Sequence, residues 1–267
     1  MTDALRLYGR LLGASVRSQM QYPASFLMQG LGTLVITGIE FLAIAVLFER
    51  FGGLKGWTLP QVALLYAMAN LSFAFGEWAG RGFDTFSGMV KSGEFDRVLL
   101  RPRTAALQIA GRELAFKRFG RALQALIVLA WAMPACGIAW TPAHIGLLCS
   151  AILGGACLFY GIFVLHATLC FWTIESLELT AILSNGGVET AQYPMDIFAP
   201  WFQRFFTYVI PLMFVNYFPG RVLLRPGLVT ANQVILDWMA PLAGVVFLAI
   251  SFRFWVFGVR HYRSTGS

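Results

Sequence analysis

The sequence predicts an all-α polytopic membrane protein formed by a single domain of 267 residues. Three observations indicate this fold class. Hydrophobic residues make up 58% of the chain and charged residues only 12%, whereas a soluble domain carries about 25% charged residues. The mean hydropathy is +0.67. Several apolar runs reach about 20 residues, the length that an α-helix needs to cross a bilayer. This composition excludes both a soluble globular domain and a disordered chain.

Six membrane spans are predicted in order along the chain. The first is apolar except for small polar residues and Glu40. The second and third are shorter but sufficient, and the fourth contains no Lys, Arg, Asp or Glu. Glutamates interrupt the fifth, whereas the sixth is broken only by Asp237 near its start and Arg253 near its end. The predicted spans are residues 24–48, 61–80, 121–140, 143–172, 174–193 and 233–257.

The distribution of positive charge supports this count, because Lys and Arg near span ends accumulate on the cytoplasmic side. With six spans and a cytoplasmic N-terminus, 15 of the 20 Lys and Arg residues are cytoplasmic, and nine of them lie between Arg81 and Arg121. An odd number of spans would place the basic C-terminal residues outside. We therefore expect both termini in the cytoplasm. Since orientation explains the net charge of +7, no nucleic-acid partner is predicted.

Two further segments have patterns unlike a straight span. Residues 5–20 alternate apolar side chains with three arginines, which is typical of an amphipathic helix in the membrane interface; a plain cytoplasmic extension of the first span is the alternative. Residues 194–224 are largely apolar, but prolines and Arg204 break them into short pieces. These pieces suit a re-entrant outer hairpin better than a straight span.

The sequence contains no catalytic, cofactor-binding or metal-binding motif. It lacks the G-x-x-x-x-G-K-[ST] phosphate loop, the H-E-x-x-H zinc motif and the G-x-S-x-G nucleophile motif. The four cysteines are 8 to 13 residues apart, farther than the usual pairs of metal ligands, and are expected to pack as small buried residues. We therefore expect no enzymatic activity from this chain alone.

Residues 81–118, between the second and third spans, combine many charges with recurring large apolar residues. A glycine and a proline delimit a short predicted helix over residues 94–100. This helix would present Phe95, Val98 and Leu99 on one side and charged residues elsewhere. An apolar knob with a charged rim suits a soluble partner. An ordinary loop whose arginines contact anionic lipid is the alternative.

Residues 91–102 read Lys-Ser-Gly-Glu-Phe-Asp-Arg-Val-Leu-Leu-Arg-Pro. Together with Gln21-Tyr22, Gly56-Trp57 and the spaced prolines before the sixth span, this string resembles the six-span permeases of type-2 ABC exporters over nearly the whole chain. The resemblance implies an N-terminal interface helix, a re-entrant outer hairpin and a coupling helix that sits in a cleft of an ATP-hydrolysing subunit. It assigns that contact to Gly93, Glu94, Phe95, Asp96, Arg97, Leu99, Leu100, Arg101 and Pro102.

The same resemblance implies the partners of the chain. Two copies of a P-loop ATPase subunit would bind ATP and Mg²⁺, so this chain itself would hold no cofactor. A second permease chain, identical or different, would complete a path through the lipid of the inner (plasma) membrane. Export is implied by the resemblance alone, and the sequence leaves the cargo open between a drug-like amphiphile, a peptide and a lipid.

Candidates for the substrate path come from one acidic and several aromatic residues. Glu40 lies deep within a span, where a carboxylate costs about 2–3 kcal/mol unless it is paired, protonated or facing water. Two roles are therefore considered for Glu40: a contact with the substrate, or an interhelical hydrogen bond. An aromatic group in the predicted outer hairpin fits either an exit gate or an interfacial belt: Phe202, Phe205, Phe206 and Tyr208.

Two other classes of function are weighed against a permease. An integral membrane enzyme that handles lipids would need a cluster of His, Asp or Glu at one depth, which the sequence does not supply. A non-transporting scaffold remains open on the sequence alone.

Overall fold

The computed structural model describes residues 20–113, 119–173, 177–228 and 231–262, together with residues 9, 13, 14, 17 and 18. Within these ranges the chain is helical and contains no β-strand. In chain order the elements are α2 (Pro23–Phe51), α3 (Leu59–Asp84), α4 (Phe86–Lys91), α5 (Glu94–Leu99), α6 (Ala105–Ala110), α7 (Phe119–Ala135), α8 (Pro142–Leu169), α9 (Leu177–Ala191), η2 (Met195–Ile197), α10 (Pro200–Tyr208), η3 (Met213–Tyr217), α11 (Phe218–Leu224), η4 (Pro226–Leu228), α12 (Ala231–Met239) and α13 (Leu242–His261).

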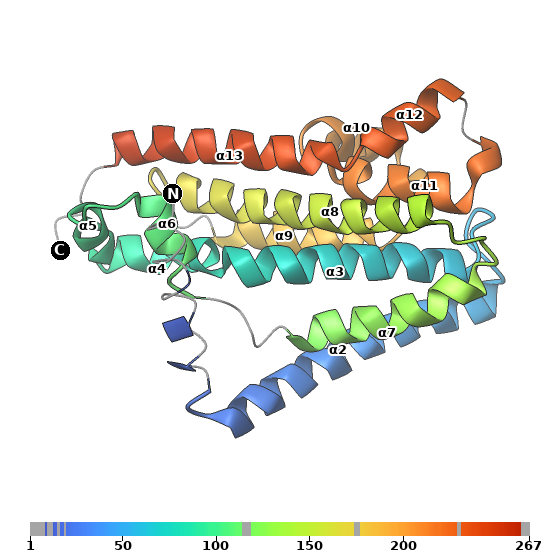
Figure 1. Ribbon diagram of the computed structural model, residues 1–267, viewed down its shortest axis with the longest axis horizontal. Helices are drawn as coiled ribbons and strands as arrows, with labels where there is room; N and C mark the ends of the chain where they lie inside the picture. Colours follow the sequence, from blue (N-terminus) through green and yellow to red (C-terminus); the bar gives the residue numbers. More distant parts are fainter. Residues whose placement is uncertain are drawn as a thin grey trace.

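Helices α2, α3, α7, α8, α9 and α13 extend broadly along the long axis of the molecule, with α2 and α7 inclined to the others (Figure 1). Successive members run in opposite directions, so their connections alternate between the two ends. Among the described residues, four helical stretches are long and apolar enough to cross a membrane: Pro23–Phe51, Leu59–Lys91, Pro142–Leu169 and Leu242–His261. Helix α7 has 17 residues and α9 has 15. The fold is therefore that of a polytopic membrane protein, and the count of six spans stays a prediction.

The last predicted span, residues 233–257, differs from a single continuous helix. The chain turns at Ala240 and Pro241, which separate α12 from α13. Proline has no backbone N–H to donate and its ring clashes with the preceding helical turn, so Pro241 begins a new helix instead of continuing α12. Helix α13 then extends beyond the predicted end, to His261.

Helix α3 lies at the centre of the bundle, packed along α7 and α8, and α8 in turn packs along α13. Glycines permit the close approach of these helices. A Cβ atom at Gly76 would lie 2.8 Å from the Cβ of Phe159, and one at Gly244 would lie 1.9 Å from the carbonyl oxygen of Gly154. Without those side chains the backbones can come together. The result is a close-packed core around α3 and α8.

Helix α2 rests on α7 and turns most of its apolar side chains outward. The two helices meet where a Cβ at Gly120 would lie 1.9 Å from the carbonyl oxygen of Gly30. The outward-facing apolar side chains of α2 are suited to contact with lipid tails, which are equally apolar. The exposed apolar residues of α2 include Leu27, Met28, Leu31, Val35, Ile36, Ile39, Leu42, Val46 and Leu47.

The predicted outer hairpin, residues 194–224, consists of short helices: η2, α10, η3 and α11. The segment is attached to the long helices through Asn216 of η3, whose side-chain amide donates to the carbonyl oxygens of Leu65 in α3 and Ala191 in α9. The segment is divided near Pro194, Pro200 and Pro211 as predicted, whereas the helical run continues from η3 into α11 through Pro219. Its placement in a membrane stays a prediction. Most of the predicted interface helix, residues 5–20, lies outside the described residues.

Candidate functional site

Helices α4, α5 and α6 gather at one end of the bundle, which we call the α5 end (Figure 1). Helix α5 begins directly after Gly93, which has a φ of +66° and forms the turn from α4. This left-handed conformation is costly for any residue with a Cβ atom, and glycine adopts it freely. The sequence thus builds two short helices, of six residues each, joined by a sharp glycine turn.

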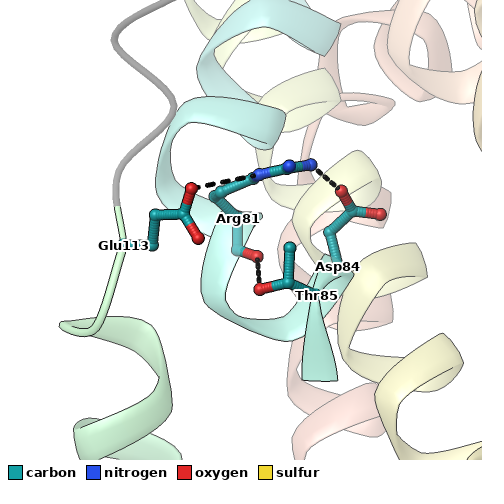
Figure 2. Close-up of polar contacts among 4 residues, drawn as sticks. All are labelled: Arg81, Asp84, Thr85 and Glu113. Atoms are coloured by element: carbon teal, nitrogen blue, oxygen red, sulfur yellow. Dashed lines mark hydrogen bonds and ion pairs between the residues drawn. The ribbon is translucent and has the colours of Figure 1, made fainter. Parts of the chain in front are cut away.

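The end of α3 is tied to the chain that follows α6 (Figure 2). The guanidinium of Arg81 pairs with Asp84 one turn later and reaches Glu113, with 3.7 Å between Nε and Oε1. The hydroxyl of Thr85 donates to the carbonyl oxygen of Arg81 at 3.1 Å and closes the last turn. One arginine therefore connects both ends of the segment between α3 and residue 113.

Helix α6 lies against α3 and holds α5. A Cβ atom at Gly82 of α3 would lie only 1.9 Å from the carbonyl oxygen of Ile109, so the two backbones touch there. The side-chain amide of Gln108 donates to the carbonyl oxygen of Val98 at 3.1 Å. Arg112 pairs with Glu94 at 2.9 Å. These contacts make α5 and α6 a single unit docked on α3.

The ring of Phe95 is the centre of an aromatic cluster formed by Phe86, Phe95, Phe171, Trp255 and Tyr262. Phe95 is fully buried. Its ring centroid lies 4.9 Å from that of Phe86, 5.0 Å from that of Tyr262, 5.5 Å from that of Phe171 and 6.3 Å from that of Trp255. These partners come from α4, from the chain after α8, and from α13 and its carboxyl end. The aromatic cluster therefore joins three parts of the bundle at α5.

This packing corrects the predicted apolar knob. Phe95 and Val98 are buried in the chain's own core and do not face outward. Rings from α4, from the chain after α8, and from α13 and its carboxyl end surround Phe95. Leu99 and Leu100 are exposed instead, at 41% and 87%. The remaining residues assigned to the partner contact divide into an exposed set, Arg97, Arg101 and Pro102, and a half-buried set, Gly93, Glu94 and Asp96.

Tyr262 follows the last residue of α13 and lies next to Asp96 of α5. Burial of its hydroxyl, with a smaller effect from the Asp96 carboxylate, raises the pKa of Tyr262 to about 12. The neutral hydroxyl is thus the form that the folded chain favours. The carboxyl end of α13 and helix α5 are linked by a polar contact as well as by rings.

The predicted substrate-path residues do not form one site. Glu40 is half-buried on α2 and interacts electrostatically with Tyr66 of α3. The Tyr66 hydroxyl donates to the carbonyl oxygen of Thr37 at 2.9 Å and contacts the side-chain oxygen of Gln124 at 3.4 Å. Polar side chains of α3 and α7 therefore meet the Glu40 region of α2.

The aromatic residues of α10 are only partly gathered. The ring of Phe202 stacks on Phe198 at 4.8 Å and lies 4.8 Å from Phe206, which is 5.1 Å from Phe205. Tyr208 stands apart with 81% of its surface exposed. Three of the four predicted aromatic residues share a cluster.

A set of contacts that sequence reasoning missed lies at the opposite end of the bundle, and we call it the polar clamp: Lys55, Trp57, Asp196, Arg221, Arg225 and Asp237. The buried Trp57 indole donates to the Asp196 carboxylate at 3.0 and 3.2 Å. The Lys55 ammonium donates to the Asp196 carbonyl oxygen at 2.8 Å. The Arg225 guanidinium lies 3.8 Å from the centre of the Trp57 ring.

The second half of the polar clamp joins α11 to α12. Arg221 binds the buried carboxylate of Asp237 through two nitrogens, at 2.7 and 3.2 Å. The sequence hints at the clamp only through a tryptophan in a glycine-rich turn, because the Asp196 that accepts its hydrogen bond is 139 residues away. The clamp fastens the connection between α2 and α3 to η2 and α11.

No group of three or more His, Cys, Asp or Glu side chains in the described ranges is placed to hold a metal ion. A family model described as ABC-2 family transporter protein matches residues 34–266 of the chain. No curated protein matches the chain, and no solved structure matches it.

Proposed function

The chain belongs to the ABC-2 transporter family, and from this premise we propose that it is the permease subunit of an ATP-driven exporter, coupled to a separate ATPase through α5. Membership in this family makes the chain a membrane permease of an ABC transporter.

The observation that carries the coupling contact is the exposure of Leu100 at the tip of α5. A leucine with 87% of its surface exposed lies between the exposed arginines Arg97 and Arg101, at the end of a helix, α5, that also carries Glu94 and Asp96. An apolar anchor with an arginine rim is the composition of a protein–protein contact. The side chains that reach the ATPase are therefore Arg97, Leu99, Leu100, Arg101 and Pro102, while Phe95 fixes α5 from within.

A partner that hydrolyses ATP gives the permease a source of free energy. The sequence has no phosphate-binding loop, and a permease alone cannot favour one of two states without a ligand that binds them differently. In the proposed complex two ATPase subunits bind ATP and Mg²⁺. Their closure acts on α5 and, through it, on the membrane helices.

The assembly we propose contains two permease chains, identical or different, and two ATPase subunits. It lies in the lipid of the inner (plasma) membrane with six spans per permease and with both termini in the cytoplasm. The alternating directions of the six long helices support an even number of spans (Figure 1). The short helices of residues 194–224 form the re-entrant outer hairpin in this arrangement.

The proposed substrate path passes the Glu40 region and the aromatic residues of α10. Glu40 contributes a carboxylate to a region that already contains the Tyr66 hydroxyl and the Gln124 amide, which suits a cationic or hydrogen-bonding cargo. Phe202, Phe205, Phe206 and Tyr208 provide the apolar surface nearer the exit.

Co-purification tests the coupling contact. The permease carrying Leu99→Asp together with Leu100→Asp is purified from its native membrane, and P-loop ATPase subunits are quantified by mass spectrometry. The wild-type permease retains an ATPase, and the double variant loses at least 90% of it. Phe51→Asp is the matched control, since Phe51 is also exposed, at 71%, and ends α2 at the opposite end of the bundle. Retention of the ATPase by the double variant contradicts the proposed contact.

A further inference from the structure

The aromatic cluster connects α5 directly to the long helix α13, as well as to α4 and to Phe171 in the chain after α8. Phe95 contacts Trp255 within α13 and Tyr262 at its carboxyl end. Trp255 is itself buried against Phe86 and Phe171, with ring centroids 5.1 and 5.2 Å away. Close-packed rings of this kind cannot absorb a displacement of one member without moving the others. A shift of Phe95 is therefore felt at once by α13.

Helices α2 and α7, on the other side of the bundle, are too far from α5 to be displaced by it directly. In Figure 1 the first turns of α2 and α7 lie well away from α4, α5 and α6. Helix α3 is held by a different contact, the close approach of Gly82 to Ile109 in α6. The unit of α5 and α6 is thus attached to α3 through backbone, and to α13 and the chain after α8 through the aromatic cluster. Within α3, the ring of Phe83 also lies 5.2 Å from that of Trp255.

Helix α13 is built to carry a movement along its length. It is continuous from Leu242 to His261 and begins at the turn of Ala240 and Pro241, where the chain is separated from α12. Close to this break, the carboxyl end of α12 is fixed by the ion pair of Asp237 with Arg221. A rigid helix with a break at one end and a driven contact at the other has the form of a hinged lever.

We propose that α13 is the membrane helix that moves with α5, with Phe95 as the link and with Trp255 and Tyr262 as positioning residues. The inference rests on the proposed function, because it takes the movement of α5 from the ATPase. ATP binding shifts α5, the Phe95 ring displaces Trp255 and Tyr262, and α13 turns about the break at Pro241. The Asp96 carboxylate beside the Tyr262 hydroxyl keeps the two elements in register.

A distance measurement in the intact complex tests this inference. Spin labels are attached at Ile250→Cys in α13 and Ile127→Cys in α7, two exposed positions, after the four native cysteines have been replaced by serine. Pulsed electron resonance then compares the label separation without nucleotide and with ATP and vanadate. The separation changes in the otherwise wild-type permease. Tyr262→Ala and Trp255→Ala each reduce that change by at least half while the ATPase stays bound.

Two further variants separate the proposed role from general damage. Tyr262→Phe keeps the ring and retains most of the nucleotide-dependent change. Phe257→Ala removes an exposed ring of α13 that contacts Trp172, Phe254 and His261, and it retains the full change. The inference is overturned if Tyr262→Ala and Trp255→Ala behave as wild type, if Phe257→Ala has the same effect, or if the wild-type separation does not respond. Absence of any ATPase from the wild-type preparation overturns the proposed function itself, before labels are added.

Discussion

The ring of Phe95 lies 5.0 Å from the ring of Tyr262 at an interplanar angle of 80°. This edge-to-face contact is the favoured geometry for an aromatic pair, and it joins the helix expected to meet a partner with the end of the last long helix. Four predictions follow from the contacts at the two ends of the bundle.

Phe95→Ala is expected to lower the free energy of unfolding by about 3–5 kcal/mol, the usual cost of removing a fully buried aromatic ring. Phe95→Leu should cost less, since it fills part of the cavity. Leu100→Ala is the matched control on the same segment and should change stability by less than about 0.5 kcal/mol, because Leu100 is exposed. Thermal unfolding in detergent compares the three variants. Equal stability of Phe95→Ala and Leu100→Ala would contradict the burial of Phe95.

Gly93→Ala is expected to destabilise the turn between α4 and α5 by about 1–2 kcal/mol, because a Cβ atom is strained at a φ of +66°. Gly88→Ala provides the comparison: Gly88 is a helical residue of α4 whose added Cβ would meet nothing within 4 Å. That change should be neutral or stabilising by about 0.5–1 kcal/mol. The rate of limited proteolysis within residues 91–102 measures the effect of each of the two substitutions. A Gly88→Ala variant that is cleaved faster than Gly93→Ala would argue against the turn.

Arg221→Met should destabilise the chain by about 3 kcal/mol, since it leaves the carboxylate of Asp237 buried without its cation. Replacing both partners, with Arg221→Met and Asp237→Leu, removes the buried charge and should recover most of the loss. Chemical unfolding measures each variant. If the double variant is no more stable than the single one, the ion pair is not the source of the effect.

Tyr262 should ionise near pH 12, above the ordinary tyrosine pKa of about 10. A folded state that raises this pKa gains stability that is complete below about pH 10 and is lost as the pH rises through about 12. Ultraviolet absorbance is recorded as a function of pH for the wild type and for Tyr262→Phe, and the difference between the two titrations gives the ionisation of Tyr262. Asp96→Asn should lower the pKa while leaving it above 10, because burial is the larger cause. An ordinary pKa in the wild type would refute the packing of Tyr262.

Much of the fold could be predicted from the sequence. The long apolar runs correspond to helices, and the short helix over residues 94–100 appears as α5, Glu94–Leu99, with its glycine turn. Local patterns determine these features, since helix length, capping and breaking depend on neighbouring residues. The break at Pro241 is not evident from hydropathy, because hydropathy alone does not register a lost backbone donor.

The direction of Phe95 could not be predicted in the same way. Helical spacing shows that Phe95, Val98 and Leu99 lie close together on a short helix, but it cannot say whether their side meets a partner or the chain itself. Phe171, Trp255 and Tyr262 decide this, and they lie far along the sequence. The polar clamp escaped prediction for the same reason, because Trp57 and Asp196 are 139 residues apart.

The most direct test of the account is photo-crosslinking from α5. A photoreactive phenylalanine analogue is placed at Leu100 and, as a control, at Phe51 at the opposite end of the bundle, and both permeases are irradiated in their native membrane. Crosslinking of a P-loop ATPase subunit from position 100 and not from position 51 is the result that the account predicts. Absence of an ATPase crosslink at position 100, or an equal yield from both positions, would contradict the claim that α5 is where this permease meets its ATPase.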